Sequence, residues 1–217
     1  MNLSPAGRAF LIQKEGKYPK VYADLDTESN KRKGLIRWED AKPYTDKGWP
    51  TIGIGHLVYY RGSTWSKDER AQFESYLRNG GSSLTEQQMQ DMLDADLAPY
   101  LSRISKKLEV PVTQNQFDAL VVMAFNTGMG NRNFRLALKE TNNQNWQAAA
   151  EAIAGGPVYG SGSSAPLPGL TRRRREEAEM YLKDLDKLHS SEFPFLPVIF
   201  ISSLVTCGVI IYRRLRG

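Results

Sequence analysis

The sequence predicts an α+β fold that is mainly helical, with a small β-hairpin or sheet near the N-terminus and a transmembrane helix at the C-terminus. The hairpin is indicated by TIGIGH at residues 51–56, where isoleucines alternate with threonine and glycine as in a strand with one apolar face. The soluble helices are indicated by capping boxes that precede apolar residues at helical spacing. The transmembrane helix is indicated by residues 193–212, which carry no charge.

Composition favours one domain with an appendage. The chain has 217 residues, of which 41% are hydrophobic, enough to bury a sizeable core. Its formal charge is +5, but three arginines lie among the last five residues, so residues 1–212 carry 26 basic and 24 acidic groups. A mixed, solvated surface explains this balance, and we expect no nucleic-acid partner. The single cysteine, Cys207, excludes an intramolecular disulfide.

The first helix is predicted for residues 5–15. Ser4 is typical of an N-cap and the proline after it of the first helical position, while Gly16 is expected to end the helix. Glu15 then falls in the last turn, where the helix dipole and partial burial both disfavour an ionised carboxyl. We therefore expect Glu15 to serve as a general acid near neutral pH. From position alone, a solvated glutamate without a role is the alternative.

A small β-region is predicted to follow. Residues 20–24 form a short strand, residues 26–33 a polar turn, and residues 35–38 a second short strand or a loop anchor. Together with the strand at residues 51–56 they predict a hairpin or small meander with a long tip.

The remainder of the soluble part is predicted to be helical. Thr85 and Thr113 each begin a capping box, and Gly128 is expected to end the second of these helices. Pro99 should kink the first or shift its start. Thr171 is expected to cap an arginine-rich last helix. Further helices are predicted for residues 67–78, 132–139 and 146–154.

Four separated segments resemble, in order, the phage-type lysozymes, the endolysin family of glycoside hydrolases. They are EGKYPKVYAD at residues 15–24, TIGIGHLV at 51–58, QNQFDALVVMAFNTGMG at 114–130 and PGLTRRRREEAEMYL at 168–182. Family members carry a glutamate, eight residues, an aspartate, a short hairpin and then TIGxGH. Glu15 and Asp24 have this spacing, and the resemblance covers most of residues 1–185.

The resemblance implies a two-lobed, lysozyme-like domain over residues 1–188. A small lobe with the β-hairpin would take about residues 12–80, and an interlobe helix about residues 84–105. The large lobe would take about residues 106–188 together with the first helix. Residues 189–217 would form a membrane anchor with a basic end.

The resemblance also implies hydrolysis of the β-1,4 bond between N-acetylmuramic acid and N-acetylglucosamine in peptidoglycan, in phage lysis or as an antibacterial effector. Glu15 would be the acid, and Asp24 would act through a water that Thr51 helps to hold, which is the inverting arrangement. We expect no cofactor and no metal, because His56 and His189 are the only histidines. His56 is interpreted as a structural partner behind the sheet.

The connection between Asp24 and Thr51 is much longer than the tight hairpin of the family. It contains a second candidate carboxyl, Asp46, which would match the family aspartate only with one residue deleted before Gly48. We prefer Asp24, because it keeps the spacing from Glu15 and because an insertion at a hairpin tip disturbs a fold least. Two other functions stay open, a wall-binding protein without activity and a lytic transglycosylase, which needs only one carboxyl.

Substrate contacts are expected from two of the matching segments. Asn126 corresponds to a family position that contacts the glycan, although a local cap explains it equally well. The four arginines of residues 172–175 cannot share one helix face, so at most two can point at a ligand. Arg172 or Arg173 is the candidate contact for the carboxylates of the peptide stem. The other arginines are expected to be solvated or to pair with Glu176, Glu177 or Glu179, and a solvated face is preferred.

Residues 193–212 are long enough to cross a bilayer as a helix, and a membrane anchor is favoured over a buried core helix because the lysozyme pattern ends near residue 185. The arginines that follow favour a cytoplasmic C-terminus and a catalytic domain on the periplasmic side, next to the wall. The N-terminus lacks the apolar run of a signal peptide. Export would then use a holin-type lesion, a secretion machine or the tail itself.

Overall fold

The computed structural model describes residues 1–41, 47–58, 60–61, 64–65, 67–159 and 165–185. Its elements, in chain order, are α1 (Pro5–Glu15), β1 (Tyr18–Ala23), α2 (Glu28–Lys33), η1 (Trp38–Asp40), β2 (Pro50–Gly53), β3 (His56–Leu57), β4 (Tyr60–Arg61), β5 (Thr64–Trp65), α3 (Lys67–Phe73), η2 (Glu74–Tyr76), η3 (Arg78–Gly80), α4 (Glu86–Lys107), α5 (Gln114–Thr127), α6 (Arg132–Asn142), α7 (Trp146–Ala154) and α8 (Pro168–Leu182), where η marks a 3-10 helix. The prediction of a mainly helical chain with a small β-region is confirmed.

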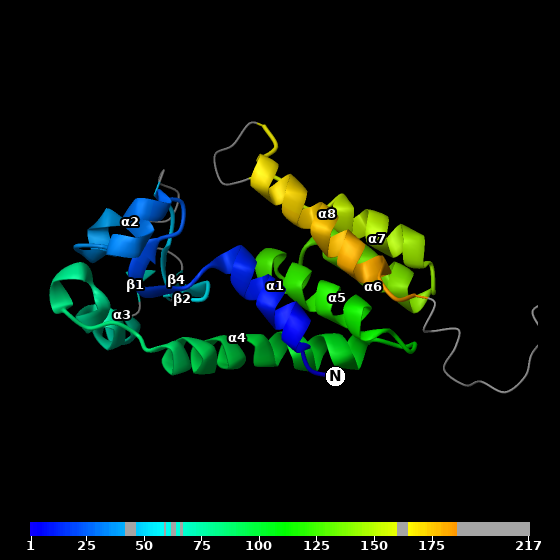
Figure 1. The fold of residues 1–217 in the computed structure, drawn as a ribbon, viewed down its shortest axis with the longest axis horizontal. Helices are drawn as coiled ribbons and strands as arrows, with labels where there is room; N and C mark the ends of the chain where they lie inside the picture. Colours follow the sequence, from blue (N-terminus) through cyan, green and yellow to red (C-terminus); the bar gives the residue numbers. More distant parts are fainter. Residues whose placement is uncertain (42–46, 59, 62–63, 66, 160–164, 186–217) are drawn as a thin grey trace, which may run out of the picture.

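The elements form two groups joined by a long helix. Figure 1 shows the strands with α2 and α3 at one end of the molecule and α5 to α8 at the other, while α4 runs along both groups. The helix α1 lies beside α5, on the side of the helical group. Large apolar side chains such as Phe117, Leu120 and Phe134 are fully or almost fully buried in this group. Their removal from water supplies its main stabilisation.

The strands β1, β2 and β3 form an antiparallel sheet in that order, so the predicted small sheet is confirmed. Residues 51–56 do not form one strand, because a turn at residues 54–55 divides them between β2 and β3, and residues 35–38 form no strand. Tyr22 of β1 lies opposite Thr51 of β2, and Thr51 lies opposite Leu57 of β3. Thr51 thus occupies the central strand and is only 4% exposed. The strands β4 and β5 pair separately as a short hairpin.

The N-terminal end of α1 is fixed to α5 through Asp118. The backbone N–H of Ser4 donates to Asp118 Oδ1 at 3.0 Å, and the Ser4 hydroxyl donates to the other carboxylate oxygen. A Cβ built on Gly7 would lie 2.6 Å from Asp118 Cγ, so the two helices meet where no larger residue fits.

Most helix ends follow the local signals in the sequence. The side chain of Ser4 caps α1 by accepting from the Gly7 N–H, and Thr85 and Thr113 form the two predicted capping boxes. Gly16 and Gly128 end their helices as predicted. These ends are set by hydrogen bonds between residues close in sequence, which is why they can be predicted.

The polar turn predicted for residues 26–33 is wrong, because Glu28–Lys33 form α2. The side chain of Thr27 accepts from the Asn30 N–H at 3.4 Å at one end, and Gly34 with φ of 76° closes the other. A helix this short spans less than two turns, so it carries no apolar period that could predict it.

Other helix boundaries also differ from the predictions, and α6 extends to Asn142 rather than ending at residue 139. The helix α8 begins at Pro168 rather than after Thr171, whose hydroxyl donates to the carbonyl of Leu167 at 3.2 Å. Proline suits the first helical position because the N–H that it lacks has no partner inside a helix. The helix α3 ends at Phe73 rather than at residue 78, and η2 follows it.

Three predicted features fall outside the described residues. They are the transmembrane segment at residues 193–212, the alternative carboxyl Asp46, and residues 160–164 of the loop before α8. Within the described ranges, no helix combines the length and the apolar character that crossing a bilayer requires.

Candidate active site

Glu15 is the last residue of α1, as the sequence predicts. Arg173 on α8 donates from Nη2 to Glu15 Oε1 at 2.7 Å. The side chains of Arg173 and Glu15 are 7% and 17% exposed, so the ion pair is largely shielded from water. The helix α8 therefore orients the carboxyl of Glu15 at the end of α1.

Arg173 belongs to a buried charge network. Its Nε donates to Glu177 Oε1 at 2.9 Å, and Arg174 Nη1 lies 2.7 Å from the other oxygen of Glu177. Arg174 also donates from Nη2 to Asn126 Oδ1 on α5. Burial lowers the pKa of Arg173, but the charges of Glu15 and Glu177 outweigh burial and hold this pKa above its ordinary value. Arg173 therefore stays charged and keeps its ion pair with Glu15.

The arginines of residues 172–175 divide differently from the prediction. Arg172 and Arg175 are exposed, and Arg175 lies 3.6 Å from Glu179. Arg174 is fully buried, so the preferred prediction of a solvated side chain is wrong for it, whereas the alternative of a pair with Glu177 is confirmed. Its spacing from Glu177 places both side chains on the face of α8 that packs against the other helices, where each charge compensates the other.

The second oxygen of Glu15 faces the turn between β2 and β3. A Cβ built on Gly55 would lie 3.2 Å from Glu15 Oε2 and 3.4 Å from the ring of Phe125. Gly55 also has φ of 72°, which disfavours other residues. The second glycine of TIGIGH thus lets the sheet approach the carboxyl.

Asp24 follows β1 and is joined to Thr51 through the backbone of Trp49. The Trp49 N–H donates to Asp24 Oδ1 at 2.7 Å, and the Trp49 carbonyl accepts from the Asp24 N–H at 3.0 Å. The same carbonyl accepts from Thr51 Oγ1 at 3.2 Å. The structure thus brings Asp24 and Thr51 to one end of the β1–β2 pair.

The charges of both predicted carboxyls, Glu15 and Asp24, affect the pKa of Tyr22. Burial raises its pKa, and the negative charges of Glu15 and Asp24 act in the same direction. Burial also raises the pKa of Asp24 itself, partly offset by the hydrogen bond from Trp49 and the charge of Lys31. The charges of Glu15 and Asp24 thus both act on one buried tyrosine.

Gly48 controls the position of Asp24, and we predict that Gly48→Ala lowers activity. A Cβ at Gly48 would lie 1.9 Å from Asp24 Oδ1, and φ is 76°, so alanine both strains the backbone and displaces the carboxyl. A displacement of the carboxyl by about 1 Å can reduce kcat by about 10²-fold. Release of reducing sugar from peptidoglycan measures the change.

Gly81→Ala is the matched control for this prediction. Gly81 has nearly the same φ, 77°, but no atom lies within 4 Å of a Cβ built there. It should cost about 1–2 kcal/mol of unfolding free energy and leave kcat unchanged. Equal activity losses in the two variants would show that strain, rather than the position of Asp24, is responsible.

A polar pocket of about 460 Å³ opens beside Glu15. It is bounded by the end of α1, the start of β1 and the helix α2. The Tyr18 hydroxyl donates to Glu28 Oε2 at 2.5 Å along this boundary, and burial raises the pKa of Tyr18 to about 12. Of the residues predicted to act in the site, Glu15 lines the pocket.

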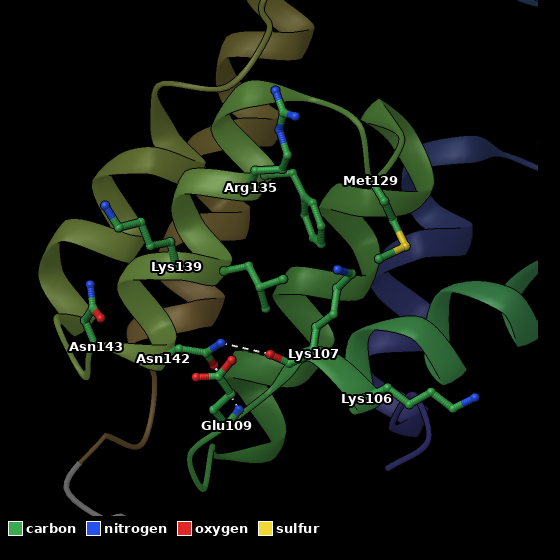
Figure 2. A pocket seen from close by; sticks show the side chains of 10 residues that line it. Lys106, Lys107, Glu109, Met129, Arg135, Lys139, Asn142 and Asn143 are labelled. Carbon is green, nitrogen blue, oxygen red and sulfur yellow. Dashed lines mark hydrogen bonds between the residues drawn. The ribbon is translucent and has the colours of Figure 1, made fainter.

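A second pocket, of about 540 Å³, lies between the end of α4 and α6 (Figure 2). Asn142 closes its lower edge by donating to the Lys107 carbonyl at 2.8 Å and accepting from the Glu109 N–H at 3.0 Å. Its lining contains none of the predicted site residues. The candidate active site is therefore the region around Glu15, Asp24 and Thr51.

His56 forms a contact of the kind that the sequence predicts. Its Nδ1 lies 2.9 Å from Asp96 Oδ2 and 3.0 Å from Asp96 Oδ1 on α4. This contact joins the sheet to the long helix. No cluster of three or more His, Cys, Asp or Glu side chains suited to a metal is found in the part of the chain that the structure covers.

The sequence allows Glu177 and Arg174 to pair but does not show that the pair is buried and orients Arg173. Their signal is the spacing of arginines at 173 and 174 from a glutamate at 177, which places all three within one helical turn. The spacing alone does not distinguish an exposed pair from a buried one. Burial is decided by the packing of α8 on α5 and α7, which brings together distant parts of the chain.

Comparisons with known proteins identify the family of the chain. The model of the phage lysozyme family matches residues 37–177. The endolysin of Salmonella phage P22 is 33% identical over 141 residues, covering 64% of this chain and 86% of the relative. The endolysin of Bacillus phage B103 is 33% identical over 197 residues, covering 88% of this chain and 58% of the relative.

The solved structures agree as well. An endolysin from Escherichia coli O157:H7 phage FAHEc1 superposes with a TM-score of 0.56 at 26% identity, covering 84% of this chain and 94% of that one. The chain belongs to the phage lysozyme family. It has a lysozyme-like fold, and its class of activity is that of a lysozyme hydrolase.

Proposed function

We propose that the chain is a muramidase that hydrolyses the β-1,4 bond between N-acetylmuramic acid and N-acetylglucosamine in peptidoglycan. The observation that carries this proposal is that Arg173 orients Glu15 against the turn after β2, while the backbone of Trp49 ties Asp24 to Thr51 at the start of the same strand. Glycoside hydrolysis needs two carboxyl groups on either side of the scissile bond. The endolysin relatives support the same substrate.

In this proposal Glu15 protonates the leaving oxygen as general acid. Asp24 activates a water molecule that Thr51 helps to hold, and the product is inverted at the anomeric carbon. Arg173 orients Glu15, which its contacts support better than direct substrate binding. Arg172 and Asn126 are exposed and remain the proposed glycan or peptide contacts.

The activity is tested with the purified full-length chain in detergent and isolated peptidoglycan sacculi. We expect release of reducing ends, which hydrolysis of the glycan produces. Products that carry 1,6-anhydromuramic acid would identify a lytic transglycosylase instead. Sedimentation with sacculi without any release would identify a wall-binding protein.

The second carboxyl is tested by comparing Asp24→Asn with Asp46→Asn. We predict that Asp24→Asn lowers kcat by about 10²-fold, the lower end of the effect of a general base, and that Asp46→Asn leaves kcat unchanged. The same reducing-sugar assay measures both. An active Asp24→Asn chain would contradict the assignment of Asp24 as the second catalytic carboxyl. An inactive Asp46→Asn chain would indicate that Asp46 has this role.

The pKa of Asp24 also predicts how Asp24→Asn changes the free energy of unfolding. Because burial raises this pKa in the folded chain, ionised Asp24 costs stability once the pH rises through its folded value. Asp24→Asn should therefore raise the free energy of unfolding at pH 7, and the gain should vanish below about pH 4, where the aspartate is protonated in the unfolded chain too. Urea unfolding at the two pH values measures this sign.

We propose further that residues 193–212 anchor the chain in a membrane, with the lysozyme domain on the periplasmic side. The proposal rests on the uncharged run and on the arginines after it. Protease treatment of intact spheroplasts tests it, because only a periplasmic domain would be digested. Deleting a co-expressed holin tests whether a holin-type lesion contributes to export.

A further inference from the structure

The polar pocket beside Glu15 is cationic. Two anionic residues line it, Glu15 and Glu28, against four cationic ones. The cations come from two elements: Lys14 and Lys17 flank the end of α1, and Lys31 and Arg32 belong to α2. Half of the positive charge therefore comes from the long connection between Asp24 and Thr51, which the family's tight hairpin does not provide.

The helix α2 is fixed against β1, so its side chains have a defined position. The Leu35 N–H, just beyond the helix, donates to the Val21 carbonyl of β1 at 2.6 Å. A Cβ built on Gly34 would lie 2.9 Å from Lys20 Cβ, which shows how closely the end of α2 approaches the strand. Glu28, at its start, accepts from the Tyr18 hydroxyl. The position of α2 is thus set at both ends.

Arg32 differs from the other cations of the pocket. Lys14 pairs with Glu176, Lys17 with Glu86 at 2.6 Å, and Lys31 with Glu28 at 3.3 Å. Arg32 is exposed and makes no ion pair with any residue that the structure describes. The Nζ atom of Lys31 also lies 5.9 Å from the ring centroids of Tyr18 and Tyr22. The pocket therefore offers a guanidinium beside a second, partly compensated cation.

We propose that Arg32, supported by Lys31, binds a carboxylate of the peptide stem of peptidoglycan and so makes the stem a determinant of substrate recognition. This inference rests on the proposed muramidase activity. A guanidinium matches a carboxylate through two parallel hydrogen bonds, which a neutral sugar cannot offer. The stem is attached to N-acetylmuramic acid, one of the two sugars that flank the scissile bond, so its carboxylates come near Glu15. An anionic wall polymer attached far from this bond has no such constraint.

The experiment compares Arg32→Gln with the wild-type chain on two soluble glycan substrates, one with intact peptide stems and one stripped of stems by an amidase. We expect kcat/KM of Arg32→Gln to fall about tenfold on the stem-bearing glycan, the lower range for a hydrogen bond between charged groups, mostly through a higher KM. On the stripped glycan it should equal the wild-type value. Lys33→Gln is the matched control, since Lys33 is an exposed cation of the same helix outside the pocket lining and should change neither value.

Four outcomes would overturn the inference. Equal losses on both substrates would place Arg32 against the glycan or the fold, and no loss on either would exclude it from binding. Equal losses in Arg32→Gln and Lys33→Gln would indicate a general charge effect. A wild-type chain that cleaves the stripped glycan as well as the stem-bearing one contradicts the subsite alone, whereas one that cleaves neither contradicts the proposed function itself.

Discussion

Glu15→Gln is expected to lower kcat by about 10²–10⁴-fold, because glutamine cannot supply the proton that the leaving oxygen needs. Glutamine has nearly the same size, so the packing at the end of α1 should be kept. Arg173 loses one carboxylate but keeps its hydrogen bond to Glu177, so it is not left without a counter-charge. Release of reducing sugar from peptidoglycan measures the activity, and circular dichroism with urea unfolding checks the fold.

A comparison variant shows whether the loss is specific to this carboxyl. Glu151→Gln changes an exposed glutamate on α7 whose side chain accepts from Gln147 and lines none of the pockets described above. It should retain wild-type turnover. If a folded Glu15→Gln chain has a kcat within about threefold of the wild-type value, Glu15 is not the general acid.

Glu177→Gln should give the largest loss of stability, about 3–5 kcal/mol in the free energy of unfolding. Glu177 is fully buried and compensates Arg173 and Arg174, and the second of these is also fully buried. A neutral side chain would leave buried positive charge without its counter-charge, which is the costly way to alter an internal ion pair. Urea unfolding at pH 7 measures the difference.

The same helix provides the control. Glu179 pairs with Arg175 at 3.6 Å, and these side chains are 67% and 70% exposed, so Glu179→Gln should change stability by less than about 0.5 kcal/mol. If the two variants lose equal stability, the cost belongs to the helical propensity of α8 rather than to the buried charges. A neutral result for Glu177→Gln would show that the network contributes little to folding.

The predictable parts of the fold are those encoded by residues close together in sequence. Ser4, Thr85 and Thr113 each cap a helix through a neighbour three residues away, so their positions could be predicted directly. The family resemblance, the lysozyme class and the mainly helical fold with a small sheet are confirmed. The assignments of Glu15, Asp24 and Thr51 to catalytic roles stay predictions, as does the membrane anchor.

The features that could not be predicted depend on distant contacts or on very short elements. Arg173 reaches Glu15 across 158 positions of the chain, and only the packing of α8 beside α1 decides this contact. No local pattern distinguishes buried Arg174 from its exposed neighbour Arg175. The helix α2 falls below the length at which periodicity is informative, and it carries the cations that line the pocket.

The attachment of α1 to Asp118 means that the two proposed catalytic carboxyls belong to different halves of the molecule. Glu15 is carried by a helix bound at its start to α5 and oriented at its end by α8, whereas Asp24 and Thr51 are tied together within the sheet. Only Gly16 and Lys17 separate α1 from β1. The distance between the carboxyls decides whether a glycosidase inverts or retains the sugar configuration. In this chain the two-residue joint between α1 and β1 therefore helps to set the distance between the two proposed catalytic carboxyls.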